Sequence, residues 1–141
     1  MSQCEMVDVN FADEFGRTEL FISAFFGQMD KVKTLILEGA TIDQARSDGA
    51  TPLFAAAGNG HVNAVKMLLD HGAQVNHRNA IGRTALFNAS MYGHVETVRV
   101  LINRSAVINI RDCYGQTPYS CAIARGEHDV ARFLLASASH G

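Results

Sequence analysis

A glycine-rich string is the first candidate for chemistry in this sequence. Residues 58–64 read Gly-Asn-Gly-His-Val-Asn-Ala. Apart from one extra residue before Ala64, they resemble the G-x-G-x-x-A pattern that holds a dinucleotide pyrophosphate when it follows a β-strand and opens a helix. Here the string follows a predicted helix, and Gly60 occupies the position of a helix-ending glycine. We therefore interpret Gly60 as structural and expect no cofactor.

Histidine and cysteine side chains could hold a metal ion or act as nucleophiles. His61 and His94 lie 33 residues apart, and the cysteines are Cys4, Cys113 and Cys121. The sequence has neither Cys-x-x-Cys nor His-Glu-x-x-His spacing, and no serine has the surroundings of a hydrolase nucleophile. The sequence predicts no metal site and no catalysis.

Arginine side chains could bind the phosphates of a nucleic acid. Arg78, Arg83 and Arg111 come near successive predicted turns, but the chain has twelve lysine and arginine residues against fourteen aspartate and glutamate. Because affinity for nucleic acid grows with the number of phosphates neutralised, such a surface needs more cations. We predict no nucleic-acid binding.

The charge is spread unevenly along the chain. Residues 1–48 hold nine acids and four bases, and residues 49–141 hold five acids and eight bases. The net charges are therefore −5 and +3. A basic later half would favour an acidic partner surface, although a solvated face is the simpler interpretation.

The strongest pattern in the sequence is a period of 33 residues. It is carried by a Gly-x-Thr motif, by a second glycine, and by an alanine followed three residues later by Asn or Asp. The first motif begins at Gly16, Gly49, Gly82 and Gly115; the second glycine is Gly27, Gly60, Gly93 and Gly126; the third pair is Ala40/Asp43, Ala73/Asn76 and Ala106/Asn109. The period predicts tandem repeats, whose function resides on a stacked surface.

The second unit shows which elements one repeat should form. Thr51 is a natural helix N-cap, and Pro52 suits the first helical position, where its missing N–H costs nothing. A short alanine-rich helix over 53–59 should end at Gly60. A longer helix over 61–71 then carries apolar residues at the spacing of one helix face. The remainder of the unit should run extended into the next turn.

These motifs resemble the ankyrin repeat. The resemblance is carried by residues 49–57, Gly-Ala-Thr-Pro-Leu-Phe-Ala-Ala-Ala, together with Gly60-His61, Leu68-Leu69 and the segment 72–76. Four units, 13–45, 46–78, 79–111 and 112–141, cover about nine tenths of the chain. The resemblance implies an all-α solenoid of helix-turn-helix units joined by β-hairpin-like turns, forming one domain over residues 1–141.

The sequence departs from the family pattern at several positions. The histidine that usually follows Thr-Pro-Leu is replaced by Phe21, Phe54, Phe87 and Ser120. We expect packing to replace the hydrogen bond that an imidazole makes within the turn. Other departures, such as Glu19 in place of proline, fall in the end units, where capping repeats differ.

The N-terminal segment leaves two interpretations open. Residues 7–10, Val-Asp-Val-Asn, are in register with 40–43 and 73–76. Residues 1–12 are therefore either an N-terminal cap or the remnant of a preceding repeat. The first helix is unusually apolar for an end unit, since it contains Phe25 and Phe26. We expect residues 1–12 to cover part of it, with another chain as the alternative.

The resemblance also implies where a partner would bind. Turn tips and the exposed edges of the short helices should line a concave face. The ends of the short helices fall at Phe25/Phe26, Gly58/Asn59, Met91/Tyr92 and Ala124/Arg125. The predicted partner-binding residues are Phe15, Arg17, Asp48, Ile81, Arg83, Met91, Tyr92, Tyr114 and Arg125.

We expect an apolar and cationic anchor site in the third unit and on the next turn tip, built around Arg83 and Tyr92 of the third unit and Tyr114 of the fourth. It would take an aliphatic or aromatic side chain flanked by an acidic group. The alternative for Ile81 and Met91 is that they pack within the stack.

The function implied by the resemblance is protein–protein interaction, as an adaptor or scaffold. The alternative is a structural module, a fragment of a longer array or a homodimer through Phe25 and Phe26. No apolar run approaches the ~20 residues of a membrane helix, and no secretory signal is evident. Cysteines without a pairing pattern suit a reducing compartment. We therefore expect a cytoplasmic protein, with the nucleus also possible.

Overall fold

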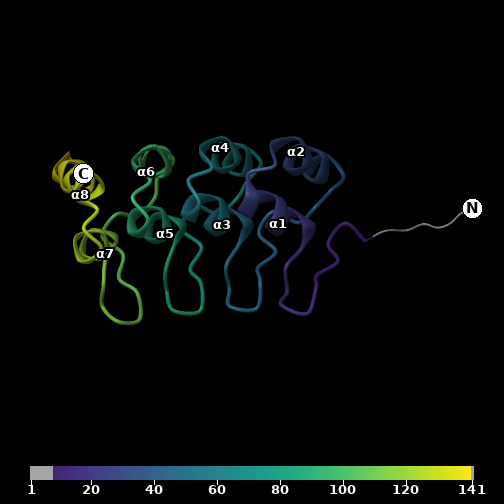
Figure 1. Ribbon diagram of the computed structural model, residues 1–141, viewed down its shortest axis with the longest axis horizontal. Helices are drawn as coiled ribbons and strands as arrows, with labels where there is room; N and C mark the ends of the chain where they lie inside the picture. Colours follow the sequence, from purple (N-terminus) through teal and green to yellow (C-terminus); the bar gives the residue numbers. More distant parts are fainter. Residues whose placement is uncertain (1–7, 141) are drawn as a thin grey trace, which may run out of the picture.

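The computed structural model of the protein describes residues 8–140, and over that range the chain forms eight helices in four stacked pairs (Figure 1). The helices are α1 (Glu19–Phe26), α2 (Met29–Leu37), α3 (Pro52–Gly58), α4 (Val62–Asp70), α5 (Ala85–Met91), α6 (Val95–Asn103), α7 (Pro118–Ala124) and α8 (His128–His140). No β-strand occurs among the described residues, and the predicted all-α repeat solenoid is confirmed.

The helices form two layers along the stack. The odd-numbered helices lie side by side in an inner layer next to the long hairpin loops, and the even-numbered helices form the outer layer (Figure 1). Each helix packs against its partner within the unit and against the equivalent helix of the next unit. Because every unit contacts only its neighbours, one face of the inner layer stays open along the whole array.

Local sequence sets the helix ends much as predicted. The side chain of Thr51 accepts a hydrogen bond from the backbone N–H of Phe54 at 3.3 Å, and Pro52 begins α3. After α3, Gly60 adopts a φ of 71°, a left-handed conformation that favours glycine. Helices α3 and α4 therefore match the predicted ranges 53–59 and 61–71 to within one residue at each end.

The core runs between the units as a continuous layer. The leucine of each of the first three units, two residues after the capping threonine, is fully buried; these are Leu20, Leu53 and Leu86. Burying one such side chain contributes roughly 2 kcal/mol. Two of the phenylalanines that replace the usual histidine, Phe21 and Phe87, are also buried, so packing does replace the imidazole there. Phe54 is only half-buried, because its ring borders the open face.

Backbone hydrogen bonds join each hairpin to the next one. The second residue of each later unit donates to the carbonyl of the third residue of the unit before it. These bonds link Ser47 to Phe15 at 3.0 Å, Ala80 to Asp48 at 2.9 Å and Cys113 to Ile81 at 2.9 Å. The row of turn tips is thereby held at a fixed spacing, which makes it a rigid edge for a binding surface.

The predicted register of residues 7–10 reappears as a shared hydrogen bond. A side-chain oxygen near the end of one unit accepts a backbone N–H from the end of the next. The bonds run from Thr41 to Asn10 (2.7 Å), from Gln74 to Asp43 (3.1 Å) and from Val107 to Asn76 (2.8 Å). The rest of the predicted N-terminal cap, including Cys4, lies in residues 1–7, outside the described residues.

Candidate functional site

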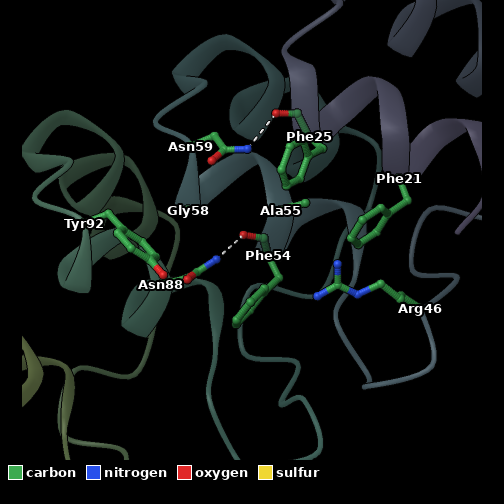
Figure 2. A pocket seen from close by; sticks show the side chains of 9 residues that line it. All are labelled: Phe21, Phe25, Arg46, Phe54, Ala55, Gly58, Asn59, Asn88 and Tyr92. Atoms are coloured by element: carbon green, nitrogen blue, oxygen red, sulfur yellow. Dashed lines mark hydrogen bonds between the residues drawn. The ribbon is translucent and has the colours of Figure 1, made fainter. Parts of the chain in front are cut away.

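A hollow of about 450 Å³ opens on the inner layer, across the first helices of units 1, 2 and 3 (Figure 2). We call it the aromatic pocket. Its lining consists of Phe21, Phe25, Arg46, Phe54, Ala55, Gly58, Asn59, Asn88 and Tyr92. The pocket lies on the concave side that the sequence predicted, although it is centred one unit earlier than the expected anchor site.

Gly58, which has no side chain, lies in the lining of the pocket beside Asn88. At the same repeat position the other units carry Phe25, Met91 and Ala124. A Cβ atom on Gly58 would lie 2.1 Å from Nδ2 of Asn88, so the amide of Asn88 occupies that space. Any larger residue at position 58 would displace Asn88 and fill the floor of the pocket.

Two asparagine amides supply the polar groups of the pocket. Nδ2 of Asn59 donates to the carbonyl of Phe25 at 2.8 Å, and Nδ2 of Asn88 donates to the carbonyl of Phe54 at 2.9 Å (Figure 2). These bonds fix the orientation of both amides. Neither Oδ1 atom accepts a hydrogen bond from another described residue, so each can accept one from a bound chain.

Aromatic rings form the walls. Tyr92 stands at one end of the labelled lining and Phe21 at the other, with Phe25 and Phe54 between them (Figure 2). The ring of Tyr92 is 48% exposed. Rings of this kind offer a large apolar contact area at a low cost in side-chain entropy. The pocket therefore combines apolar walls with fixed hydrogen-bond acceptors.

Arg46 closes the pocket on the side of the hairpins. Its guanidinium lies 5.0 Å from the centre of the Phe21 ring, and Nε and Nη2 donate to the two carboxylate oxygens of Asp48 at 3.0 and 2.8 Å. The hydrogen bond from Arg46 is the largest influence on Asp48, and it lowers the pKa of that carboxyl. The charge of Arg46 is thus balanced, and its plane is held over the ring.

Arg46 is an exception at its repeat position, and this exception is visible in the sequence. The first residue of the other three units is Asp13, Asn79 or Asp112, and each accepts backbone N–H groups of its own turn. In the second unit arginine stands there, and Asp48 accepts a turn N–H instead. The sequence analysis did not predict Arg46, Asn88 and Phe54 as binding residues. A comparison of the four first-position residues would have identified Arg46, because it is the only basic residue among them.

Arg83 is used inside the stack. Its Nε donates to Oδ2 of Asp112 at 3.0 Å, Nη2 donates to Gln116 at 3.3 Å, and Nη1 lies 3.3 Å from the sulfur of Met91. Only 19% of the Arg83 side chain is exposed. Ile81 and Met91 are both half-buried. Arg83 therefore joins units 3 and 4, and Met91 contacts it within unit 3.

Asp112 is the buried acid of this junction. Burial of its carboxyl opposes ionisation, but hydrogen bonds from the backbone N–H of Gln116, from Arg83 and from the backbone N–H of Tyr114 outweigh that effect. The pKa of Asp112 is lowered as a result. The ion pair with Arg83 is therefore present at neutral pH.

The remaining predicted site residues lie along the turn tips and at the pocket edge. Phe15, Arg17 and Asp48 surround a second, shallower hollow together with Arg46 and Ser47. Arg17 pairs with Asp13 and stacks over the ring of Phe15. Tyr114 is 71% exposed, and Arg125 lies over the ring of Tyr92. Of the nine predicted residues only Tyr92 lines the aromatic pocket, and the binding role of all nine stays a prediction.

Stacked helix pairs with projecting hairpins define a solenoid repeat protein whose open inner face is concave. A family model described as "Ankyrin repeats (3 copies)" matches residues 2–79 and again residues 75–141, so the chain belongs to the ankyrin-repeat family. A comparison with curated proteins found no match. Ankyrin repeats are generally protein–protein interaction modules.

Metal-binding clusters and membrane-spanning helices are both absent from the part of the chain that the structure describes. Within residues 8–140, no group of three or more His, Cys, Asp or Glu side chains is arranged to hold a metal ion. None of the described helices is both long and apolar enough to cross a membrane.

Proposed function

We propose that the protein binds a partner protein through the aromatic pocket, with one apolar side chain of the partner inserted between Phe25, Phe54 and Tyr92. The observation that carries this proposal is the aromatic pocket itself, a hollow of the inner layer that Gly58 and Asn88 line together. The volume of about 450 Å³ falls within the range of sites that enclose an anchoring group.

The contacts of the pocket suit a peptide chain. Partly exposed aromatic rings are enriched among the residues that dominate binding energies. The Oδ1 atoms of Asn59 and Asn88 can accept backbone N–H groups of a bound segment, since their Nδ2 atoms are already used. A non-catalytic role is part of the proposal, because the lining offers apolar faces and acceptors, and its one charged side chain is held by Asp48. The proposal also includes a role for the protein as an adaptor or scaffold in the cytoplasm.

A displayed library of random peptides provides the first test. Peptides selected on the wild-type protein are measured against Gly58→Leu, which fills the pocket, and Ala124→Leu, which makes the same change at the same repeat position in unit 4. We expect the selected peptides to bind Gly58→Leu at least about tenfold more weakly and Ala124→Leu as well as wild type. Equal binding to both variants would place the partner site elsewhere.

A second variant guards against misfolding of Gly58→Leu. Tyr92 is half-exposed at the surface, so Tyr92→Ala should keep the thermal unfolding temperature close to that of wild type. It should still weaken the selected peptides by about tenfold, on the order of 1.4 kcal/mol. A folded Tyr92→Ala with undiminished binding would count against the pocket.

Self-association through the first unit is a second candidate function. The Phe26 side chain is 61% exposed, and its ring packs edge-on against Phe25 at a centroid distance of 5.0 Å. Because Phe25 lines the aromatic pocket and Phe26 does not, Phe26→Ser separates the two functions. Light scattering over a wide concentration range should show a dimer that Phe26→Ser dissociates. A monomer at all concentrations would remove this candidate.

A further inference from the structure

We propose that the partner segment carries a carboxylate on the side of its anchor residue that faces unit 4, and that Arg125 receives this carboxylate. The inference rests on the proposed function, because it assigns a partner chemistry to the same pocket. It is carried by the distribution of paired and unpaired arginines along the concave side.

Most arginines of the described chain already have a carboxylate partner. Six of the nine form ion pairs, namely Arg17, Arg46, Arg83, Arg99, Arg104 and Arg132. The three that form no ion pair with a described residue are Arg78, Arg111 and Arg125. Arg78 is the last residue of unit 2, Arg111 is the last residue of unit 3, and Arg125 lies in unit 4. Positive charge is therefore left uncompensated toward the C-terminal half of the array.

Two of these arginines hold the hairpins of units 3 and 4. Arg78 donates to the carbonyl of Gly82 at 3.1 Å and to the carbonyl of Arg111 at 2.5 Å. Arg111 donates to the carbonyl of Gly115 at 2.9 Å. A neutral carbonyl fixes a guanidinium without cancelling its charge. These hairpins therefore keep a positive electrostatic potential beside the open face of the inner layer.

Of the three arginines without an ion pair, Arg125 is the one in contact with a residue of the aromatic pocket. Its guanidinium carbon lies 5.1 Å from the centre of the Tyr92 ring, and Tyr92 forms the pocket wall nearest to unit 4. The closest acid in the sequence, Glu127, is packed against Gly93: its Oε1 is 2.2 Å from where a Cβ of Gly93 would be. A guanidinium that rests on a ring keeps its in-plane N–H groups for a carboxylate.

The opposite end of the groove is electrically balanced. Arg46 is held by Asp48, and Arg17 is held by Asp13, with an N–O distance of 2.8 Å in each pair. An acidic residue of the partner gains nothing at this end, but gains an ion pair at the Tyr92 end. The charge pattern therefore fixes the direction of the bound segment, with the anchor in the pocket and the acid toward unit 4.

The test uses the displayed peptide library described above, selected in parallel on wild type, on Arg125→Glu and on Lys66→Glu. Lys66 is an exposed residue of the outer helix α4, and its reversal changes the net charge equally. On wild type and Lys66→Glu we expect aspartate or glutamate to be enriched at a fixed distance on one side of an aromatic or aliphatic residue. On Arg125→Glu that position should lose its acidic preference, and wild-type peptides should bind about tenfold more weakly.

The remaining outcomes separate the two proposals. Peptides that need Gly58 but show no acidic preference, or that bind Arg125→Glu unchanged, overturn this inference and leave the proposed function standing. Peptides that bind Gly58→Leu as well as wild type overturn both. A loss of binding that is equal for Arg125→Glu and Lys66→Glu reflects net charge alone and also overturns the inference.

Discussion

The junction between units 2 and 3 differs from the junction between units 3 and 4. At the first, His94 contacts the carbonyl of Gly58 at 2.9 Å, Asn88 donates to Phe54, and the ion pair of Arg104 with Asp70 is exposed to solvent. We call it the neutral junction because no buried ion pair crosses it. The second is joined by the ion pair of Arg83 and Asp112, whose carboxylate is fully buried. The aromatic pocket opens beside the neutral junction, whereas at the charged one Nη1 of Arg83 lies 3.3 Å from the sulfur of Met91.

This difference shows how one scaffold produces a local binding site. The two junctions share their backbone and their helix packing, so the contrast comes from a few repeat positions. Gly58 and Met91 occupy one of these positions: Gly58 lines the aromatic pocket, whereas Met91 contacts Arg83. A repeat array can therefore place a pocket at one junction without changing its core.

Removing Asp112 should have the largest effect, because it breaks the charged junction. In Asp112→Ala, Arg83 loses its partner, and the N–H groups of Tyr114 and Gln116 lose their acceptor. We expect a loss of about 3 kcal/mol in the free energy of unfolding, measured with urea. The matched change in unit 3, Asn79→Ala, removes a neutral acceptor and should cost about 1 kcal/mol. Equal losses would remove the contrast between the junctions.

Acid should weaken the charged junction through Asp112. The pKa of Asp112 is lower in the folded protein than in the unfolded chain. Its contribution to stability is therefore complete above the ordinary aspartate pKa of about 3.9, and it is lost as the pH falls through the lowered value.

The stability difference between wild type and Asp112→Asn should accordingly be constant from pH 7 to 5 and smaller at pH 3. The corresponding difference for Asn79→Ala should not change with pH, since asparagine does not titrate. Urea unfolding at each pH measures both. A wild-type advantage over Asp112→Asn that grows toward pH 3 would contradict the assignment.

His94 should contribute a smaller amount at the neutral junction. Its Nε2 contacts the carbonyl of Gly58, and His61 makes the equivalent contact with the carbonyl of Phe25 at 3.0 Å. His94→Ala should lower the free energy of unfolding by about 1 kcal/mol, the usual worth of one hydrogen bond. Glu127, at the same position of unit 4, has no donor for such a bond, so Glu127→Ala should cost less. Urea unfolding of both variants would settle the order.

The smallest expected effect is a gain. Glu127→His would place an imidazole at the position that His61 and His94 occupy, within reach of the carbonyl of Met91 by repeat symmetry. We expect the free energy of unfolding to rise by about 0.5 kcal/mol. Thermal unfolding monitored by circular dichroism can detect this gain. A loss of stability would show that the charged junction does not accept the neutral arrangement.

The sequence predicted those features that depend on residues close together in the chain. The cap at Thr51 and the glycine at position 60 placed α3 and α4, because a helix end is decided within a few residues. The repeat period then predicted the positions of all the remaining helices. The same period placed the short helices together in one layer beside the hairpins (Figure 1).

The detailed site depends on contacts between units, which the sequence pattern alone does not fix. Arg83 looked available for a partner, but Asp112, 29 residues later, reaches it across the junction. Gly58 looked like one more variable position, and only its distance to Asn88 shows that it forms the floor of a pocket. Side-chain direction and the neighbouring unit decide both cases.

The most direct test of the aromatic pocket is a ¹H–¹⁵N NMR titration of the labelled protein with a selected peptide. The side-chain amides of Asn59 and Asn88 lie in the pocket, while those of Asn63 and Asn103 lie on the outer helices α4 and α6. Binding in the pocket predicts that the first pair of NH₂ signals shifts and the second pair stays unchanged. A bound peptide that leaves Asn59 and Asn88 unshifted would contradict the proposed site.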